Sequence, residues 1–103
     1  MTIKELEEFR VICEKGSLAK ASKELYMSPQ GLSRVLKNLE TELDCTLVNR
    51  TATGLELTES GECLRDYAEI VLEEYEKLKK IRNKILQKSK TSPSSKHYLM
   101  RLI

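Results

Sequence analysis

Apolar residues that recur at intervals of seven dominate the second half of this 103-residue chain. The residues at this interval are Leu64, Val71, Leu78 and Ile85. Because Thr58 offers a helix cap just before them, the spacing predicts a single helix over about residues 59–88. At ~1.5 Å per residue this helix would extend roughly 45 Å, which is longer than a domain of this size can cover with its own core. The apolar seam therefore needs a partner.

Eight side chains are expected to form the dimerisation seam of this helix. They are Leu64, Tyr67, Ala68, Val71, Tyr75, Leu78, Ile81 and Ile85. The two tyrosines could instead stack on nucleobases, but amphipathic tyrosines within an apolar seam more often pack against a partner helix. We therefore assign all eight residues to pairing with a second helix.

Three shorter helices are predicted before residue 45. Apolar residues at spacings of three and four predict a helix over residues 2–15 that ends near Gly16. Ser17 offers the N-cap of a second helix, which is only two turns long. Ser28 followed by Pro29 is a strong start signal for a third helix, because proline suits the first helical position. The apolar stripe of this third helix is Leu32, Val35, Leu36, Leu39 and Leu43.

Two short strands are predicted after the third helix, where the apolar period changes. Residues 47–50 and 55–57 are the candidate strands, and residues 51–54 form a small hairpin loop between them. The expected fold class is mainly α. It is a winged helix-turn-helix with three helices and a two-stranded wing, followed by a long linker and dimerisation helix.

This reading divides the chain into three parts. Residues 1–58 are the predicted winged helix-turn-helix domain, with the helix-turn-helix at about 18–37, and residues 59–88 are the linker and dimerisation helix. Residues 89–103 have the composition of a hinge followed by the start of a strand. This strand, over residues 97–103, has barely begun, so the chain is expected to be part of a longer protein.

Composition argues against an enzyme, a membrane protein and a metal protein. His97 is the one histidine, so a histidine-based general base, catalytic triad or metal shell is not expected. The three cysteines are widely spaced and form no C-x-x-C pair, which argues against a zinc site and a disulfide framework. No apolar run approaches the ~20 residues of a membrane span, and no secretory signal is evident. We expect a cytoplasmic protein without cofactor or metal.

Charge is segregated along the chain. The net charge of +2 is too small to indicate a nucleic-acid partner by itself. Residues 77–103 contain nine lysines and arginines and no acidic residue, whereas the long helix begins with acidic residues. Helix-dipole complementarity explains this polarity without a ligand, so we interpret the basic run as a solvated helix face rather than a phosphate site.

The second and third helices are predicted to form a helix-turn-helix, because a three-residue turn joins them. A recognition helix of this kind enters the major groove of double-stranded DNA with its N-terminus first. The side chains that could reach base edges are Ser28, Gln30, Ser33 and Arg34. Lys37 is placed to contact phosphate, and Arg34, which suits guanine, is the strongest candidate for base recognition. Generic patterns of this type have many false positives, but the predicted wing favours DNA binding.

The residues also resemble a known family, the N-terminal domain of LysR-type transcriptional regulators. The resemblance covers residues 3 to 85 and rests on Ala21-Ser22-Lys23-Glu24-Leu25, Ser28, Leu32-Ser33-Arg34, Leu39-Glu40, Leu43, Leu47-Val48-Asn49-Arg50 and Leu57-Thr58-Glu59-Ser60-Gly61. It implies that the linker helix pairs antiparallel with a second copy, so that a homodimer places two recognition helices on an interrupted DNA dyad. It also implies that residues 89–103 are a hinge and the possible first strand of a missing C-terminal effector-binding domain, which a small-molecule effector requires. A tetramer is possible in a full-length form.

The resemblance also implies roles for individual residues. The major-groove residues are Ser28, Gln30, Ser33, Arg34 and Lys37, with Pro29 among them, and the residues that approach the backbone or minor groove are Arg50, Thr51 and Thr53. The chain departs from the family in reading Ser28-Pro29-Gln30-Gly31 where Ser-Gln-Pro-Ala is common, which puts the base partner of Gln30 in doubt. The wing lacks the additional arginine of many members, so weaker phosphate anchoring is expected.

Two alternatives stay open from the sequence. The chain could be a helical protein-interaction module whose helix-turn-helix face is inert, although Arg34 and Arg50 argue against this. It could also be a small stand-alone winged-helix repressor of another family. Cys45 lies in a predicted loop and is the cysteine for which a redox role is open.

Overall fold

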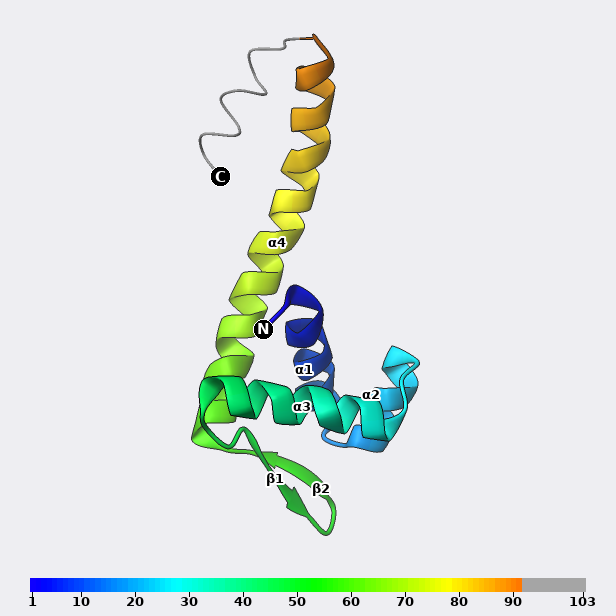
Figure 1. Cartoon of the computed structure of the whole chain (residues 1–103), viewed down its shortest axis with the longest axis vertical. Helices are drawn as coiled ribbons and strands as arrows, with labels where there is room; N and C mark the ends of the chain where they lie inside the picture. The colour runs from blue at the N-terminus through cyan, green and yellow to red at the C-terminus, as the bar shows by residue number, and fades with distance from the viewer. Residues whose placement is uncertain (92–103) are drawn as a thin grey trace. The chain divides into compact units, whose positions relative to one another are not determined.

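The computed structural model describes residues 1–91, apart from the side chains of residue 83 and of residues 87–91. The elements are α1 (Ile3–Lys15), α2 (Leu18–Leu25), α3 (Pro29–Leu43), β1 (Val48–Thr51), β2 (Gly54–Leu57) and α4 (Glu59–Thr91). The predicted fold class, mainly α with a two-stranded wing and a long last helix, is confirmed (Figure 1). Residues 1–72 form one compact unit, and the chain from residue 73 onward belongs to a second unit.

Side-chain caps fix where the helices of the first unit begin. Thr2 accepts a hydrogen bond from the backbone N–H of Glu5, whose carboxylate in turn accepts from the backbone N–H of Thr2, which makes a capping box. The predicted cap Ser28 accepts from the N–H of Gly31 at 3.0 Å, with Pro29 at the first helical position. Gly16 adopts the left-handed backbone conformation, with a φ of 67°, and ends α1 where the sequence predicts.

One apolar core joins the three short helices to the wing. Phe9 and Ile12 of α1, Leu32 and Leu39 of α3, and Leu47 before β1 are its largest fully buried side chains. These residues are the apolar stripes that the sequence shows at helical spacing. The core therefore holds α3 with its apolar stripe inward and its polar side chains outward.

A second apolar cluster packs the first turns of α4 against α1. Ala68 and Leu72 are buried with Leu6, and Leu64 packs against both clusters. Leu64 and Ala68 belong to the predicted dimerisation seam, and Ala68 is 1% exposed within its own chain. Its side chain is occupied by this intramolecular packing, because a seven-residue repeat does not reveal which neighbour a helix face meets.

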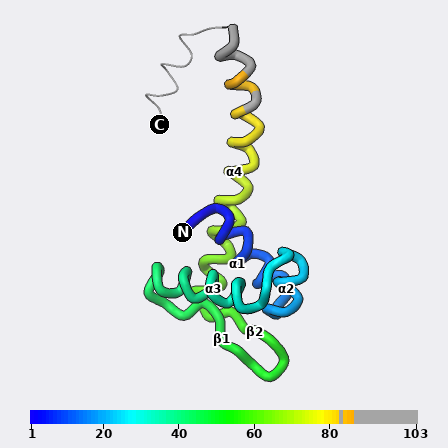
Figure 2. The backbone as a smooth tube through the Cα atoms, turned by 45° about the vertical axis from the view of Figure 1, so that its right-hand side comes forward, coloured from blue at the N-terminus to red at the C-terminus, as the bar shows by residue number. Residues whose placement is uncertain are grey.

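The wing is a two-stranded antiparallel sheet in which Val48 pairs with Leu57 and Thr51 with Gly54. Both views show this hairpin projecting beside α3 (Figures 1 and 2). The N–H of Leu55 donates to the carbonyl oxygen of Gly16 at 3.0 Å, and a Cβ atom at Gly54 would lie 2.6 Å from that same oxygen. A glycine is therefore needed where the wing approaches the turn between α1 and α2.

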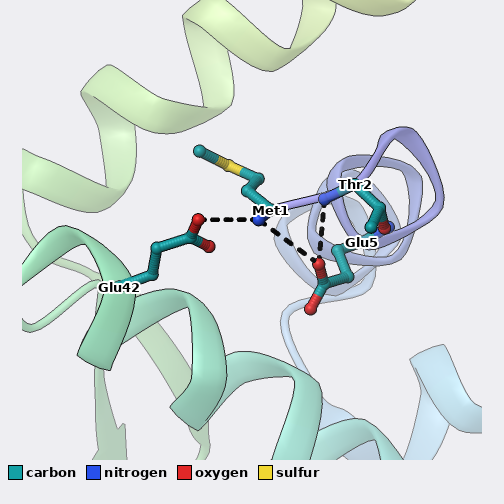
Figure 3. A network of polar contacts seen from close by, with 4 residues as sticks. All are labelled: Met1, Thr2, Glu5 and Glu42. Atoms are coloured by element: carbon teal, nitrogen blue, oxygen red, sulfur yellow. Dashed lines mark hydrogen bonds and ion pairs between the residues drawn. The ribbon is translucent and has the colours of Figure 1, made fainter.

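The amino group of Met1 links the start of α1 to the last turns of α3 (Figure 3). It lies 2.7 Å from the carboxylate of Glu42 and 4.0 Å from that of Glu5. The hydrogen bond to Glu42 raises the pKa of this amino group above its usual value. Because the contact is exposed to solvent, it makes a small contribution to stability.

The part of the chain from residue 73 continues α4 as helix to Thr91. The helix predicted over residues 59–88 extends three residues further, because Ser89, Lys90 and Thr91 are compatible with a helix. The predicted strand over residues 97–103 lies outside the described residues. Within residues 1–91, no helix is long and apolar enough to cross a membrane.

Candidate nucleic-acid interface

The N-terminal half of α3 carries most of the predicted DNA-binding residues on its exposed side. Ser28, Pro29, Gln30, Arg34 and Lys37 are exposed, and Ser33 is half-buried. Their neighbours at positions 32, 36 and 39 are buried, so the apolar stripe fixes which side of the helix faces outward. The structure therefore brings these six predicted residues together at one end of one helix.

The part of α3 that carries these residues contains no acidic residue. No Asp or Glu occurs from residue 28 to residue 39, and the first acidic residue of α3 is Glu40 in its C-terminal part. Within the described residues, Arg34 and Lys37 take part in no ion pair with an acidic partner. The N-terminus of α3 adds the positive end of its helix dipole. The surface suits a polyanion such as DNA.

Arg50 of β1 is tied to α3 by a hydrogen bond that the sequence did not reveal. Its guanidinium donates to the hydroxyl oxygen of Ser33 at 2.9 Å, across 17 residues of sequence. Arg50 is otherwise exposed, so its remaining donors face solvent beside the recognition helix. The contact places a wing cation and the recognition helix on one continuous surface.

The two wing threonines of the predicted site lie at the hairpin turn. The hydroxyl of Thr51 donates to the carbonyl oxygen of Gly54 at 3.1 Å and lies 3.4 Å from the hydroxyl of Thr53. The hydroxyl of Thr51 is thus engaged in holding the turn, whereas Thr53 is exposed. Of the two, Thr53 is better placed to approach a nucleic-acid backbone.

The predicted dimerisation residues divide between the two parts of the chain. In the compact unit, the predicted residues Tyr67 and Val71 are exposed, Tyr67 to 63%. Ile70 was not among the predicted residues, and it is 57% exposed. From residue 73 onward, the predicted residues Leu78 and Ile81 are exposed, and Tyr75 and Ile85 are half-exposed. Each part therefore presents apolar side chains that its own residues do not cover.

The cysteines differ in chemical availability, which gives a test of the fold. All three are free thiols, and burial raises the pKa of Cys13 to about 11, against a smaller lowering by Arg65. Cys63 is exposed. Since the thiolate is the reactive form, a raised pKa keeps Cys13 protonated and unreactive at pH 8.

We expect a thiol-specific chromophoric reagent at pH 8 to modify Cys63 rapidly and Cys13 slowly. The Cys63→Ser variant should lose the fast phase, whereas Cys13→Ser should keep it. The reaction of Cys13 should accelerate as the pH rises toward 11, because its thiolate fraction then increases. Equal rates for the two thiols at pH 8 would contradict the buried position of Cys13.

The whole helix-turn-helix lies within a stretch of the chain that matches a known protein family. Residues 3–62 match the family described as bacterial regulatory helix-turn-helix protein, lysR family. The "Probable RuBisCO transcriptional regulator" of Phaeodactylum tricornutum (strain CCAP 1055/1) is 35% identical over 71 residues, 69% of this chain and 23% of that protein. The "HTH-type transcriptional regulator CrgA" of Neisseria meningitidis serogroup C (strain 8013) is 39% identical over 70 residues, 68% of this chain and 23% of that protein. The chain thus spans about a quarter of these relatives.

Solved structures show the same architecture. The crystal structure of a CbnR_DBD–DNA complex superposes with a TM-score of 0.77 at 29% identity, covering 81% of this chain and 95% of that one. A BenM_DBD/catB site 1 DNA complex gives a TM-score of 0.79 at 28% identity, covering 84% of this chain and 96% of that one. These likenesses favour a regulator's DNA-binding domain over an interaction module or a repressor of another winged-helix family.

Proposed function

Because this chain belongs to the LysR family of bacterial regulatory helix-turn-helix proteins, we propose that it binds double-stranded DNA through α3 and the wing. The observation that carries the proposal is the outward surface of α3, where Arg34 and Lys37 are exposed in a segment without acidic residues and Ser33 accepts a hydrogen bond from Arg50 of the wing. Two solved structures of the same fold are complexes of a DNA-binding domain with DNA, which supports this assignment.

The proposal assigns some residues of this surface to base contacts and others to phosphate contacts. Arg34 and Gln30 read base edges in the major groove, because their side chains are exposed near the N-terminus of α3. Lys37 and Arg50 contact phosphates and fix the register on the duplex. Further contacts with the DNA are made by Ser28, Pro29, Ser33, Thr51 and Thr53. The hydrogen bond from Arg50 to Ser33 holds this wing cation against α3.

A homodimer completes the proposal. Tyr67, Val71 and Leu78 are large exposed apolar side chains, and pairing of two α4 helices would cover them. Two recognition helices then meet two half-sites of an interrupted dyad, so the geometry of the dimer sets the half-site spacing. Tetramer formation and control by a small-molecule effector are proposed only for a longer protein that carries an effector-binding domain.

The same proposal places the chain in the cytoplasm and gives it no catalytic role. The relatives named above are transcriptional regulators. Within residues 1–91, no group of three or more His, Cys, Asp or Glu side chains is arranged to hold a metal ion. The work of the chain is to position side chains on DNA, and specificity arises from the difference in affinity between sequences.

Replacing Arg34 and Lys37 separately tests the division between base and phosphate contacts. Arg34→Ala should cost ~1–3 kcal/mol on a cognate duplex and relax the base preference at one position. Lys37→Ala should weaken binding to all sequences and reduce the salt slope by about 1. Fluorescence anisotropy on cognate and random duplexes at several salt concentrations measures both effects. Equal losses on both duplexes for Arg34→Ala would refute its role in base recognition.

A further inference from the structure

A cavity of about 520 Å³ lies where the end of α3, the segment before β1 and the first turns of α4 meet. Two of the three cysteines, Cys45 and Cys63, line it, although they are 18 residues apart in the sequence. We propose that this cavity binds a small, neutral, apolar α,β-unsaturated carbonyl compound, which then forms a covalent bond to the sulfur of Cys63. All the lining residues belong to the compact unit of residues 1–72.

The lining of the cavity suits an apolar ligand. Its volume lies within the range of roughly 300–1,000 Å³ that is usual for small-molecule sites. Leu43, Leu64 and Tyr67 are part of its walls. Leu43 and Tyr67 are exposed to solvent, so a ligand in the cavity would remove apolar surface of both side chains from water.

Hydrogen bonds fix the segment that forms one wall of the cavity. The carbonyl oxygen of Leu47 accepts from the N–H of Thr58 at 3.0 Å, and the N–H of Leu47 donates to a carboxylate oxygen of Glu40 at 2.7 Å. The side chain of Leu47 is fully buried. The cavity therefore exists before a ligand arrives, as is usual for sites that bind small molecules.

Two polar residues of the lining select the charge of the ligand. Ser60 carries a hydroxyl that can donate a hydrogen bond to a carbonyl oxygen, and the carboxylate of Glu59 repels an anion. Among the described residues, no lysine, arginine or histidine lines this cavity. A neutral carbonyl compound is therefore a better ligand than a carboxylate or a phosphate.

Cys63 is the nucleophile in this proposal. Cys63 is exposed, whereas Cys45 is half-buried and packs against the apolar core. A thiol that is packed in a core behaves as a small apolar side chain, so Cys45 contributes to the wall of the cavity. The thiolate is the reactive form of cysteine, and Cys63 has the solvent access that its reaction needs.

The covalent step is an addition to a carbon–carbon double bond. The thiol of Cys63 loses its proton to water, and its sulfur forms a bond to the β-carbon of the ligand. The π electron pair of the double bond moves toward the carbonyl oxygen, and water returns one proton to the α-carbon. The net change adds S–H across the double bond, so the step needs neither an oxidant nor a reductant.

Two maleimides with the same ring test the inference without DNA. N-phenylmaleimide is neutral, whereas N-(4-carboxyphenyl)maleimide carries a carboxylate. We would measure the rate constant for adduct formation at Cys63 by peptide mass spectrometry at pH 8, and divide it by the rate constant of the same reagent with 2-mercaptoethanol. High NaCl screens repulsion by neighbouring carboxylates. After this correction, the wild type should favour the neutral reagent about tenfold.

Leu43→Ser should reduce this preference about fivefold, because it replaces an apolar wall of the cavity with a hydroxyl. Ile70→Ser is the matched control, since Ile70 is an exposed apolar residue of the compact unit that does not line the cavity. It should keep the preference within about twofold of the wild type. Circular dichroism checks the fold of each variant, and Tyr67→Ser replaces Leu43→Ser if the latter loses helix content.

Three results would overturn the inference. They are equal corrected rates for the two maleimides, an unchanged preference in the folded wall variant, and an adduct on Cys45 in place of Cys63. The protein is kept dilute, because Tyr67 also belongs to the predicted dimerisation seam. Any of these results leaves the proposed DNA binding intact, since no DNA is present and the cavity includes none of the proposed DNA-binding residues.

Discussion

Phe9→Ala should lower the free energy of unfolding by ~3–5 kcal/mol, the largest effect that we expect from a single truncation in this chain. Phe9 is fully buried, and it is the largest side chain in the core that joins α1, α3 and the wing. Removing its ring deletes buried apolar surface and leaves a cavity that the surrounding helices can only partly close. Urea unfolding followed by circular dichroism, at one fixed protein concentration, measures the change.

Tyr26→Ala is the matched control for the loss of an aromatic ring. Tyr26 is 97% exposed, so its truncation should change the free energy of unfolding by less than about 1 kcal/mol. A Phe9→Ala variant as stable as Tyr26→Ala would show that the core is not centred on α1. Loss of DNA binding in Phe9→Ala at temperatures where it stays folded is not expected, because Phe9 lies away from the exposed side of α3.

Gly61→Ala should destabilise the chain by roughly 2–3 kcal/mol, although alanine is the better helix former. In an ordinary helix this substitution gains about 1 kcal/mol. Here a Cβ atom at position 61 would overlap the carbonyl oxygen of Leu47, and that oxygen also accepts a hydrogen bond from the N–H of Thr58 at 3.0 Å. Because the obstacle is backbone, the first turn of α4 or the segment before β1 must move.

Ser60→Ala serves as the control for Gly61→Ala, because Ser60 is the exposed neighbour in the same turn. It should leave the free energy of unfolding within about 0.5 kcal/mol of the wild type. Urea unfolding distinguishes the two outcomes for Gly61→Ala. Stabilisation by the amount that helix propensity predicts would contradict the close contact between α4 and the segment before β1.

The sequence predicts most of the helices because each has a local start or stop signal. Ser28 with Pro29 marks the start of α3, Gly16 ends α1, and the Thr58 hydroxyl accepts from the N–H of Gly61 at the start of α4. These signals act within a few residues of the chain, so they can be read without knowing the tertiary fold. The outward-facing residues of α3 follow from the same helical period.

The contacts that the sequence does not reveal are those between distant segments. The hydrogen bond from Arg50 to Ser33 spans 17 residues, and nothing in either local pattern predicts it. The N–H of Leu47 similarly donates to a carboxylate oxygen of Glu40 at 2.7 Å, which helps to fix the approach to the wing. The inward position of Ala68 depends on where α1 lies, which helical periodicity alone cannot supply.

The most direct test of the central claim is an anisotropy titration of the wild-type chain with two labelled duplexes at two salt concentrations. One duplex carries an AT-rich interrupted dyad drawn from a selected library, and the other has a random sequence of equal length. We expect tighter binding to the dyad, weaker binding to both duplexes at higher salt, and loss of the preference for the dyad in Arg34→Ala. A folded dimer that binds neither duplex at low salt would contradict the account and favour a protein-interaction module.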